Sequence, residues 1–346
     1  MLKARQNKND EFYTLYGDIE KEVSMYDKEY FKDKVIFLNC DNVNHSQFYQ
    51  YFKDNFKELE IKEVHALHRR LKENDPVYHA RITKGKKNSK VREYITEVGD
   101  LTDGDFRSEY SLNILKYADL VVTNPPFSLV REFITILDEF KRDFLIICSQ
   151  NTVTYKEVYP LITDKRVRTG VYNGTMRFLL PNEYKDNKNA YLDEKDNNYY
   201  QSLGNIIWIT TLHPKIKKGE IELTHTYEDN KSNYPKYYNL DAIEVSKVSE
   251  IPIDYKGLMG VPITYLNKHN PEQFEVLGHA RDDKFIVETP RLRQFRHNKD
   301  TGKTVSTKGD LYRPLKPNEK APMLTYQDEE GNLYRRVYSR YIIRAL

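Results

Sequence analysis

The sequence is poor in the features that mark secreted, metal-binding and membrane proteins. Its 346 residues include only two cysteines, Cys40 and Cys148, too few for a disulfide framework or a cysteine-based zinc site. His65, His68 and His79 show no metal-ligand spacing. No run approaches the roughly 18 consecutive apolar residues of a membrane-spanning helix. The first residues run into polar sequence, so no secretory signal is expected. These absences predict a protein of the reducing cytoplasm that binds no metal.

Charge is unevenly distributed along the chain, although the net charge is only +3. Residues 291–346 contain 13 Lys and Arg against 6 Asp and Glu, an excess of seven positive charges. A second basic run lies in a polar stretch and consists of Arg81, Lys84, Lys86, Lys87, Lys90 and Arg92. Most charge runs are solvated surfaces, but a local basic excess is also what a surface facing a polyanion needs.

The first two-thirds of the chain alternates short apolar runs with segments of helical periodicity. This pattern predicts an α/β domain with a doubly wound, Rossmann-like sheet. The predicted strands lie at residues 35–38, 63–67, 93–98, 119–123, 144–147, 175–180 and 205–211. The predicted helices lie at residues 48–59, 109–117 and 130–140, and Ser128 is the expected cap of the last.

The pattern changes in the last third of the chain. The almost wholly polar segment 181–200 predicts a loop. After His213 the apolar runs shorten and the helical periodicity fades, which indicates a domain boundary between residues 215 and 245. We therefore expect one domain at residues 1–215 and a mixed α+β region at residues 216–346.

The strongest local motif is Asn124-Pro125-Pro126-Phe127, which ends a predicted buried strand and precedes a predicted helix. Ligands of open α/β sheets bind at the carboxyl ends of strands, so a site is expected here. The Asn124 amide oxygen and the Pro125 carbonyl could each accept a hydrogen from a planar amino group, such as N6 of adenine. Both bonds would free the nitrogen lone pair for methylation. The aromatic ring of Phe127 could stack on an extruded base.

Six segments carry a wider resemblance, and they are Asp10–Thr14, Phe37–Asp41, Gly104–Ser108, Ala118–Ser128, Tyr172–Phe178 and Gly257–Thr264. In this order they resemble the EcoRI-type family of adenine-specific DNA methyltransferases. The resemblance extends over most of the chain and is weakest beyond residue 280. It implies a site-specific enzyme that transfers methyl from S-adenosylmethionine to N6 of an adenine flipped out of double-stranded DNA.

The resemblance also implies roles for individual residues. Thr14 would contact the methionine carboxylate of the cofactor, and Asn39 and Asp41 would hold its methionine part. Asp105 would bind the amino group of the cofactor adenine, and Phe106 would cover the face of that ring. The full set implied to bind the cofactor is Tyr13, Thr14, Asn39, Cys40, Asp41, Asp105, Phe106 and Asn124.

On the same grounds, residues 1–215 are expected to be the catalytic domain and residues 216–346 the region that recognises the DNA target. A single copy of the chain is expected to act on DNA. Arginine is suited both to phosphates and to guanine edges. The expected DNA-binding residues are Arg291, Arg293, Arg296, Arg313, Arg335 and Arg336.

The sequence departs from the usual methyltransferase pattern at two places, and several alternative functions remain open. The loop after the first strand, 40–44, lacks the glycines common in methyltransferases, and no acid is evident for the cofactor ribose after the second strand. The Asn124 motif could also serve an enzyme that methylates an RNA base or a protein glutamine, or could be a turn that only ends a strand. A catalytically silent DNA-binding protein that blocks restriction is a further alternative.

Overall fold

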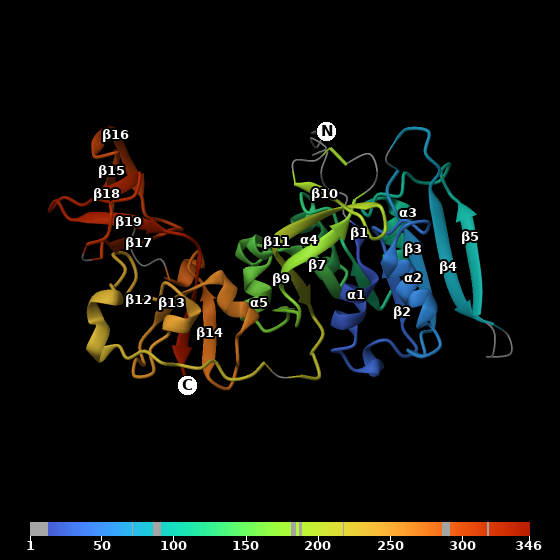
Figure 1. Ribbon diagram of the computed structural model, residues 1–346, viewed down its shortest axis with the longest axis horizontal. Coiled ribbons are helices and arrows are strands. Elements are labelled where there is room, and N and C mark those ends of the chain that lie inside the picture. The colour runs from blue at the N-terminus through green and yellow to red at the C-terminus, as the bar shows by residue number, and fades with distance from the viewer. Residues whose placement is uncertain are drawn as a thin grey trace. The chain divides into compact units, whose positions relative to one another are not determined.

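The computed structural model describes residues 13–70, 72–85, 91–180, 185–186, 189–216, 218–285, 291–316 and 318–346. The chain divides into two compact units (Figure 1). Unit 1 comprises Met1–Thr152 and Val167–Ile216, and unit 2 comprises Val153–Arg166 and Lys217–Leu346. The segment 153–166 thus belongs to unit 2, although it lies within the first domain as drawn from the sequence.

Unit 1 is built on a mixed sheet that has 11 strands among the residues described, in the order β1-β9-β11-β7-β6-β2-β3-β4-β5. The strands β8 and β10 both pair with β11. The bounds are β1 (Tyr13–Thr14), β2 (Val35–Leu38), β3 (Glu63–Leu67), β4 (Tyr78–Lys84), β5 (Val91–Glu97), β6 (Leu120–Thr123), β7 (Asp143–Ser149), β8 (Arg168–Thr169), β9 (Gly174–Leu179), β10 (Ala190–Asp193) and β11 (Asn198–Thr210). The strands β7, β6, β2 and β3 are parallel, and those flanking them are antiparallel. The predicted α/β class is confirmed.

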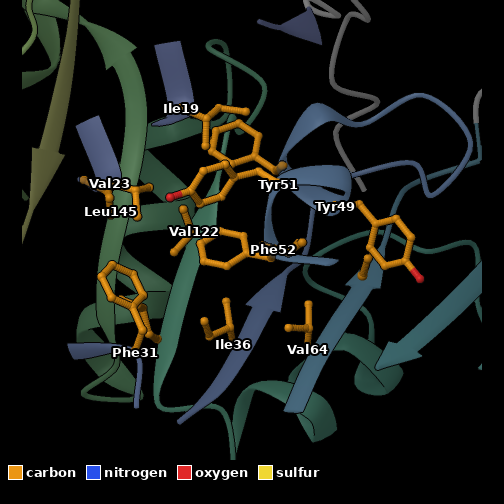
Figure 2. Packing of buried hydrophobic residues seen from close by; sticks show 14 of the residues in the cluster. Ile19, Val23, Phe31, Ile36, Tyr49, Tyr51, Phe52, Val64, Val122 and Leu145 are labelled. Atoms are coloured by element: carbon orange, nitrogen blue, oxygen red, sulfur yellow. The ribbon is translucent and has the colours of Figure 1, made fainter. Parts of the chain in front are cut away.

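Every residue of β2 and β6 is buried, as expected for parallel strands that are covered on both faces. One face packs against α1 (Tyr16–Val23) and α2 (Gln47–Asp54). Figure 2 shows Phe52 of α2 next to Val122 of β6 and Ile36 of β2, with Ile19 of α1 on the side of Tyr51. Burying each such side chain contributes about 1.5–3 kcal/mol. This packing fixes β2 and β6 side by side.

The predicted helices are present, with one correction. The helix α3 (Glu109–Leu115) follows Ser108, whose hydroxyl accepts a hydrogen bond from Ser111 N at 3.2 Å. The helix α4 (Val130–Glu139) does not begin at a Ser128 cap, because Leu129 holds the N-cap position. The chain makes an additional turn there, in which Leu129 N donates to Pro126 O at 2.9 Å.

One strand was not predicted from the sequence, and one predicted loop was wrong. The polar stretch before residue 91 contains β4, which pairs with both β3 and β5. In this part of the basic run, Arg81 pairs with Glu63, and Lys84 Nζ lies 2.8 Å from Asp33 Oδ1. Lys86, Lys87 and Lys90 lie outside the described residues. The predicted loop 181–200 contains β10 and the start of β11, which form an antiparallel hairpin.

Unit 2 has two sheets and one α-helix, α5 (Tyr159–Thr163), among its described residues. The four-stranded sheet has the order β12-β13-β20-β14, and the five-stranded sheet has the order β16-β15-β18-β19-β17. The bounds are β12 (Ile243–Glu244), β13 (Met259–Pro262), β14 (Phe274–His279), β15 (Arg291–Arg296), β16 (Lys299–Ser306), β17 (Leu311–Pro314), β18 (Leu324–Gln327), β19 (Leu333–Val337) and β20 (Arg340–Ala345). Leu311 and Val337 of the second sheet pack in one cluster with Ile342 of the first.

Candidate active site

The direction in which strands are added to the sheet of unit 1 reverses at β2. Its neighbour on one side is β3, the next parallel strand along the chain, and on the other side it is β6. In open α/β sheets, ligands bind outside the carboxyl ends of strands at such a reversal. The segment 39–41 follows β2, and the segment 124–127 follows β6. The Asn124 motif and the segment implied to hold the methionine part of the cofactor therefore follow neighbouring strands.

The loop after β6 is held firmly on its scaffold. Pro125 is buried, whereas Asn124, Pro126 and Phe127 are partly buried. Phe127 packs against the main hydrophobic cluster of unit 1. The two prolines fix φ at successive positions, and the bond from Leu129 N to Pro126 O closes the turn. The loop is thus stiff and starts from a fully buried strand.

Asp41 links the ends of β2 and β6. Its Oδ2 accepts a hydrogen bond of 2.6 Å from the hydroxyl of Thr123, the residue directly before Asn124. Its Oδ1 accepts a bond of 2.6 Å from Ser46, which also caps α2. Burial raises the pKa of Asp41 to about 6, although both hydroxyl bonds oppose the increase. A carboxylate has about four acceptor positions, so a cation could still bind this group.

Two of the predicted cofactor residues carry buried oxygens without a hydrogen-bond partner in the described part of the chain. They are Thr14 Oγ1 in β1 and Asn39 Oδ1 directly after β2. Both residues are almost fully buried, with exposed fractions of 4% and 2%. Buried polar atoms are nearly always paired, so such exceptions require a reason. Bonds to a bound ligand would satisfy both atoms.

The segment around Asp105 approaches the end of β3 closely. Gly104 has φ of 77°, and a Cβ atom there would lie 1.8 Å from His68 O, so only glycine fits. The carboxylate of Asp105 accepts bonds from Arg107 Nε at 2.8 Å and Arg107 Nη2 at 2.7 Å. Burial alone would raise the pKa of Asp105, but the Arg107 bonds outweigh it and lower the pKa. The ring of Phe106 packs edge-on against Phe133, with centroids 5.1 Å apart.

Cys40, which lies between Asn39 and Asp41 in the sequence, is a partly buried free thiol. Burial raises the pKa of this thiol, and the charges of Asp41 and Asp105 raise it further. Cys40 therefore lies near both carboxylates. The structure brings together the residues that follow β2, the loop that follows β6 and the segment at Asp105. Tyr13, whose ring centroid is 5.9 Å from that of His45, connects β1 to the loop after β2.

The expected DNA-binding arginines have different surroundings within unit 2. Arg291, Arg293 and Arg296 are exposed on β15, where Arg293 pairs with Asp300. Arg313 is buried instead, and only 6% of its side chain is exposed. Its guanidinium donates two hydrogen bonds to the carboxylate of Glu319, from Nη1 at 2.8 Å and from Nη2 at 2.9 Å.

The two arginines of β19 are also paired. Arg335 binds the same Glu319 as Arg313, and Arg336 Nη1 lies 3.3 Å from Asp310 Oδ2. Arg313 is therefore better explained as part of the internal structure of the sheet than as a DNA contact. Its burial could not be foreseen from a sequence segment that alternates charged, polar and aromatic residues.

Sequence reasoning assigned no role to Thr123, Ser46 or Arg107. In the sequence, Thr123 is only the last residue of a predicted strand, and Ser46 shows only the general signal of a helix cap. Arg107 lies inside a quoted motif, Gly104–Ser108, but its bonds to Asp105 depend on the turn that follows Gly104. In each case the role depends on a contact that becomes visible only in the folded chain.

Among the described residues, no group of three or more His, Cys, Asp and Glu side chains is arranged to hold a metal ion. None of the helices described has the length and apolar character needed to cross a membrane.

Comparison with known proteins decides the family. The family model for the adenine-specific methyltransferase EcoRI matches residues 1–344. This chain belongs to that family. It is therefore an enzyme of the adenine-specific DNA methyltransferase class.

Three curated relatives agree. The chain is 42% identical to the Type II methyltransferase M.EcoRI of Escherichia coli over 310 residues, which are 85% of this chain and 94% of the relative. It is 34% identical to M.MgeORF184P of Mycoplasma genitalium over 85% of this chain and 90% of the relative. It is 35% identical to M.MpnI of Mycoplasma pneumoniae over 80% and 84%, respectively. No solved structure matches the chain significantly.

Proposed function

We propose that this methyltransferase transfers methyl from S-adenosylmethionine to N6 of one adenine within a specific sequence of double-stranded DNA. The observation that carries the proposal is the placement of the Asn124 loop next to Asp41, at the point where the order of a parallel sheet reverses. We further propose that β3, β2, β6 and β7 are the core of a doubly wound, Rossmann-like sheet with the cofactor at this edge.

The residues present fit such a cofactor. S-adenosylmethionine supplies an electrophilic methyl group on a sulfonium centre, together with an ammonium, a carboxylate and an adenosine. Asp41 offers a buried carboxylate to the ammonium, and the oxygens of Thr14 and Asn39, which have no partner among the described residues, add polar groups nearby. Asp105 is positioned by Arg107 to accept from an adenine amino group, and Phe106 lies next to it in a buried position.

The Asn124 loop activates the target nitrogen. The amide oxygen of Asn124 and the carbonyl of Pro125 each accept one N6 hydrogen, which moves the amino group away from planarity. The bound cofactor would supply the methyl group and leave as the neutral thioether S-adenosylhomocysteine, while N6 gains the new N–C bond and releases one of its protons to water. Placing fixed acceptors where positive charge develops is the main source of catalysis in this account. Neither a covalent enzyme intermediate nor a metal is needed for this step.

The target adenine must leave the duplex because N6 is paired inside it. Phe127 would stack on the flipped base, a contact whose removal costs about 1–3 kcal/mol. The ring packs in part against the hydrophobic core of unit 1.

We assign recognition of the DNA sequence to residues 216–346. The exposed Arg291, Arg293 and Arg296 of β15 are the best candidates for contacts with phosphates or guanine edges. Arg335 and Arg336 could contribute after exchanging a carboxylate partner for phosphate. One copy of the chain is sufficient for this arrangement.

A parallel transfer experiment tests the proposal. The enzyme would be incubated with S-adenosylmethionine labelled in its methyl group and with duplex DNA, RNA or protein extract. Label in DNA, recovered as N6-methyladenine at one recurring sequence, is the expected result. Label in RNA or in protein glutamine, with none in duplex DNA, would overturn it.

A further inference from the structure

The first residue after β3 is a histidine whose tautomer is set by its neighbours. Asn44 N donates to Asn42 Oδ1 at 2.9 Å, which fixes the orientation of the Asn42 amide. The amide nitrogen of Asn42 then faces His68 Nε2 at 3.0 Å. An amide NH2 can only donate, so His68 Nε2 must accept and the ring proton resides on Nδ1.

That proton has no acceptor in the described part of the chain. His68 Nδ1 is buried and makes no hydrogen bond with any of those residues. Burial lowers the pKa of His68 to about 4, and the nearby His45 lowers it further while Asp75 opposes the change. The ring is therefore neutral at physiological pH, with a single N–H that needs a partner.

The position of His68 connects it to both halves of the candidate cofactor site. On one side, Asp41 N donates to Leu67 O at 3.1 Å, which ties the loop after β2 to the end of β3. On the other side, Arg70 N donates to Asp103 O at 2.7 Å, and Arg69 Nε lies 3.6 Å from Asp105 Oδ2. His68 thus lies between the segment proposed to hold the methionine part and the segment proposed to hold the adenine.

The group that joins methionine and adenine in the cofactor is the ribose. In dinucleotide-binding sheets, the ribose hydroxyls meet a carboxylate that follows the second strand. Residues 68–72 contain no carboxylate, and Glu63 lies at the start of β3, where it pairs with His65 at 2.8 Å. An N–H donor is what this chain offers at the end of the strand.

We propose that His68 Nδ1–H donates a hydrogen bond to a ribose hydroxyl of the cofactor, with Asn42 as the residue that fixes its tautomer. This inference rests on the proposed use of S-adenosylmethionine. It also explains how the chain binds a ribose without the usual acid.

The test compares ligands that differ only in the sugar. Calorimetry would measure the dissociation constants of S-adenosylhomocysteine and of its 2′-deoxy and 3′-deoxy analogues for the full chain. The wild type should bind one deoxy analogue about tenfold more weakly, which corresponds to about 1.4 kcal/mol. In His68→Ala the parent ligand should lose about the same factor, and the discrimination between parent and analogue should fall to within twofold.

Two further variants separate this contact from a general effect on folding. His68→Gln keeps an N–H donor and should recover part of the discrimination. Asn42→Leu removes the group that fixes the tautomer and should reduce the discrimination while the fold remains. His225→Ala, a partly buried histidine of unit 2, is the matched control and should behave as the wild type.

A measurement on the wild type alone covers the case in which His68→Ala does not fold. Nitrogen NMR of labelled histidine should show His68 protonated at Nδ1, and its signal should shift with S-adenosylhomocysteine more than with the discriminated analogue. Unchanged discrimination in a folded His68→Ala, or a proton on Nε2 in the wild type, would overturn the inference alone. No binding of S-adenosylhomocysteine by the wild type would overturn the proposed function and this inference together.

Discussion

Replacing Asp41 by asparagine removes a buried charge but keeps the shape of the side chain. Asp41 exposes only 7% of its surface, and burial raises its pKa from 3.8 to about 6. The difference of about 2 pKa units corresponds to about 3 kcal/mol, because one unit is about 1.4 kcal/mol. The folded enzyme holds this proton more tightly than the unfolded chain does. Asp41 therefore lowers the free energy of unfolding by about 3 kcal/mol as pH rises from about 4 to about 6, with no further change above.

The assay is urea denaturation of the ligand-free wild type and Asp41→Asn between pH 4.5 and 7.5. The difference in unfolding free energy between the two proteins should increase in favour of the variant from pH 4.5 to about pH 6 and stay constant from there to pH 7.5. Asp105→Asn is the matched control, because the pKa of Asp105 is lowered and its titration lies below the range. A difference that does not depend on pH in the Asp41 variant would refute the reasoning.

The same charge should favour the ammonium of the cofactor. Calorimetric affinity of the wild type for S-adenosylhomocysteine should fall as pH decreases through 6, approaching a tenfold loss per unit, because protonated Asp41 cannot pair with the cation. Asp41→Asn should bind weakly at every pH and show no such step. The buried charge of Asp41 would then lower the stability of the folded enzyme but be needed to bind the cofactor.

Three other predictions concern the target base, DNA binding and the stability of unit 2. Phe127→Ala should weaken binding of a flipped-out base by about 1–3 kcal/mol. With 2-aminopurine at the target position, the fluorescence should increase on binding of the wild type only. An equal increase with the variant would contradict stacking of the base on this ring. Arg291→Ala should weaken DNA binding. If Arg291 contacts a phosphate, the slope of the logarithm of the binding constant against the logarithm of the salt concentration should fall by about one; if it contacts a base, specificity should relax at one position of the site. Arg313→Ala should instead lower the unfolding free energy by about 1.5–3 kcal/mol, the range for hydrogen bonds to a charged group, because Glu319 keeps its bond to Arg335. A stable Arg313→Ala that only loses DNA affinity would reverse this distinction.

The sequence predicted the centre of unit 1 well because its signals there are local. The apolar runs of β2 and β6 are buried at every residue, and Asn124 follows one of them directly. The strands β4 and β10 were not predicted because pairing with adjacent strands, rather than an apolar sequence, keeps them extended. Only two of the seven residues of β4 are buried, Ala80 and Ile82.

The site was predicted less completely than the fold. The motif residues at the ends of the strands could be named, whereas the bonds that position them could not. Asp41 and Thr123 are 82 positions apart in the chain, and their bond follows only from the adjacency of β2 and β6. The buried state of Arg313 likewise depends on Glu319, which no periodicity connects to it.

The central claim is that the Asn124 loop performs methyl transfer, and its most direct test is a single-turnover measurement with Asn124→Ala. Labelled S-adenosylmethionine and duplex DNA would be bound at saturation, and N6-methyladenine would be quantified by mass spectrometry. Asn113→Ala, at an exposed position of α3, is the control. We predict that Asn124→Ala binds cofactor and DNA within severalfold of the wild type but forms no detectable N6-methyladenine. Turnover near the wild-type rate, with N6-methyladenine still the product, would contradict it.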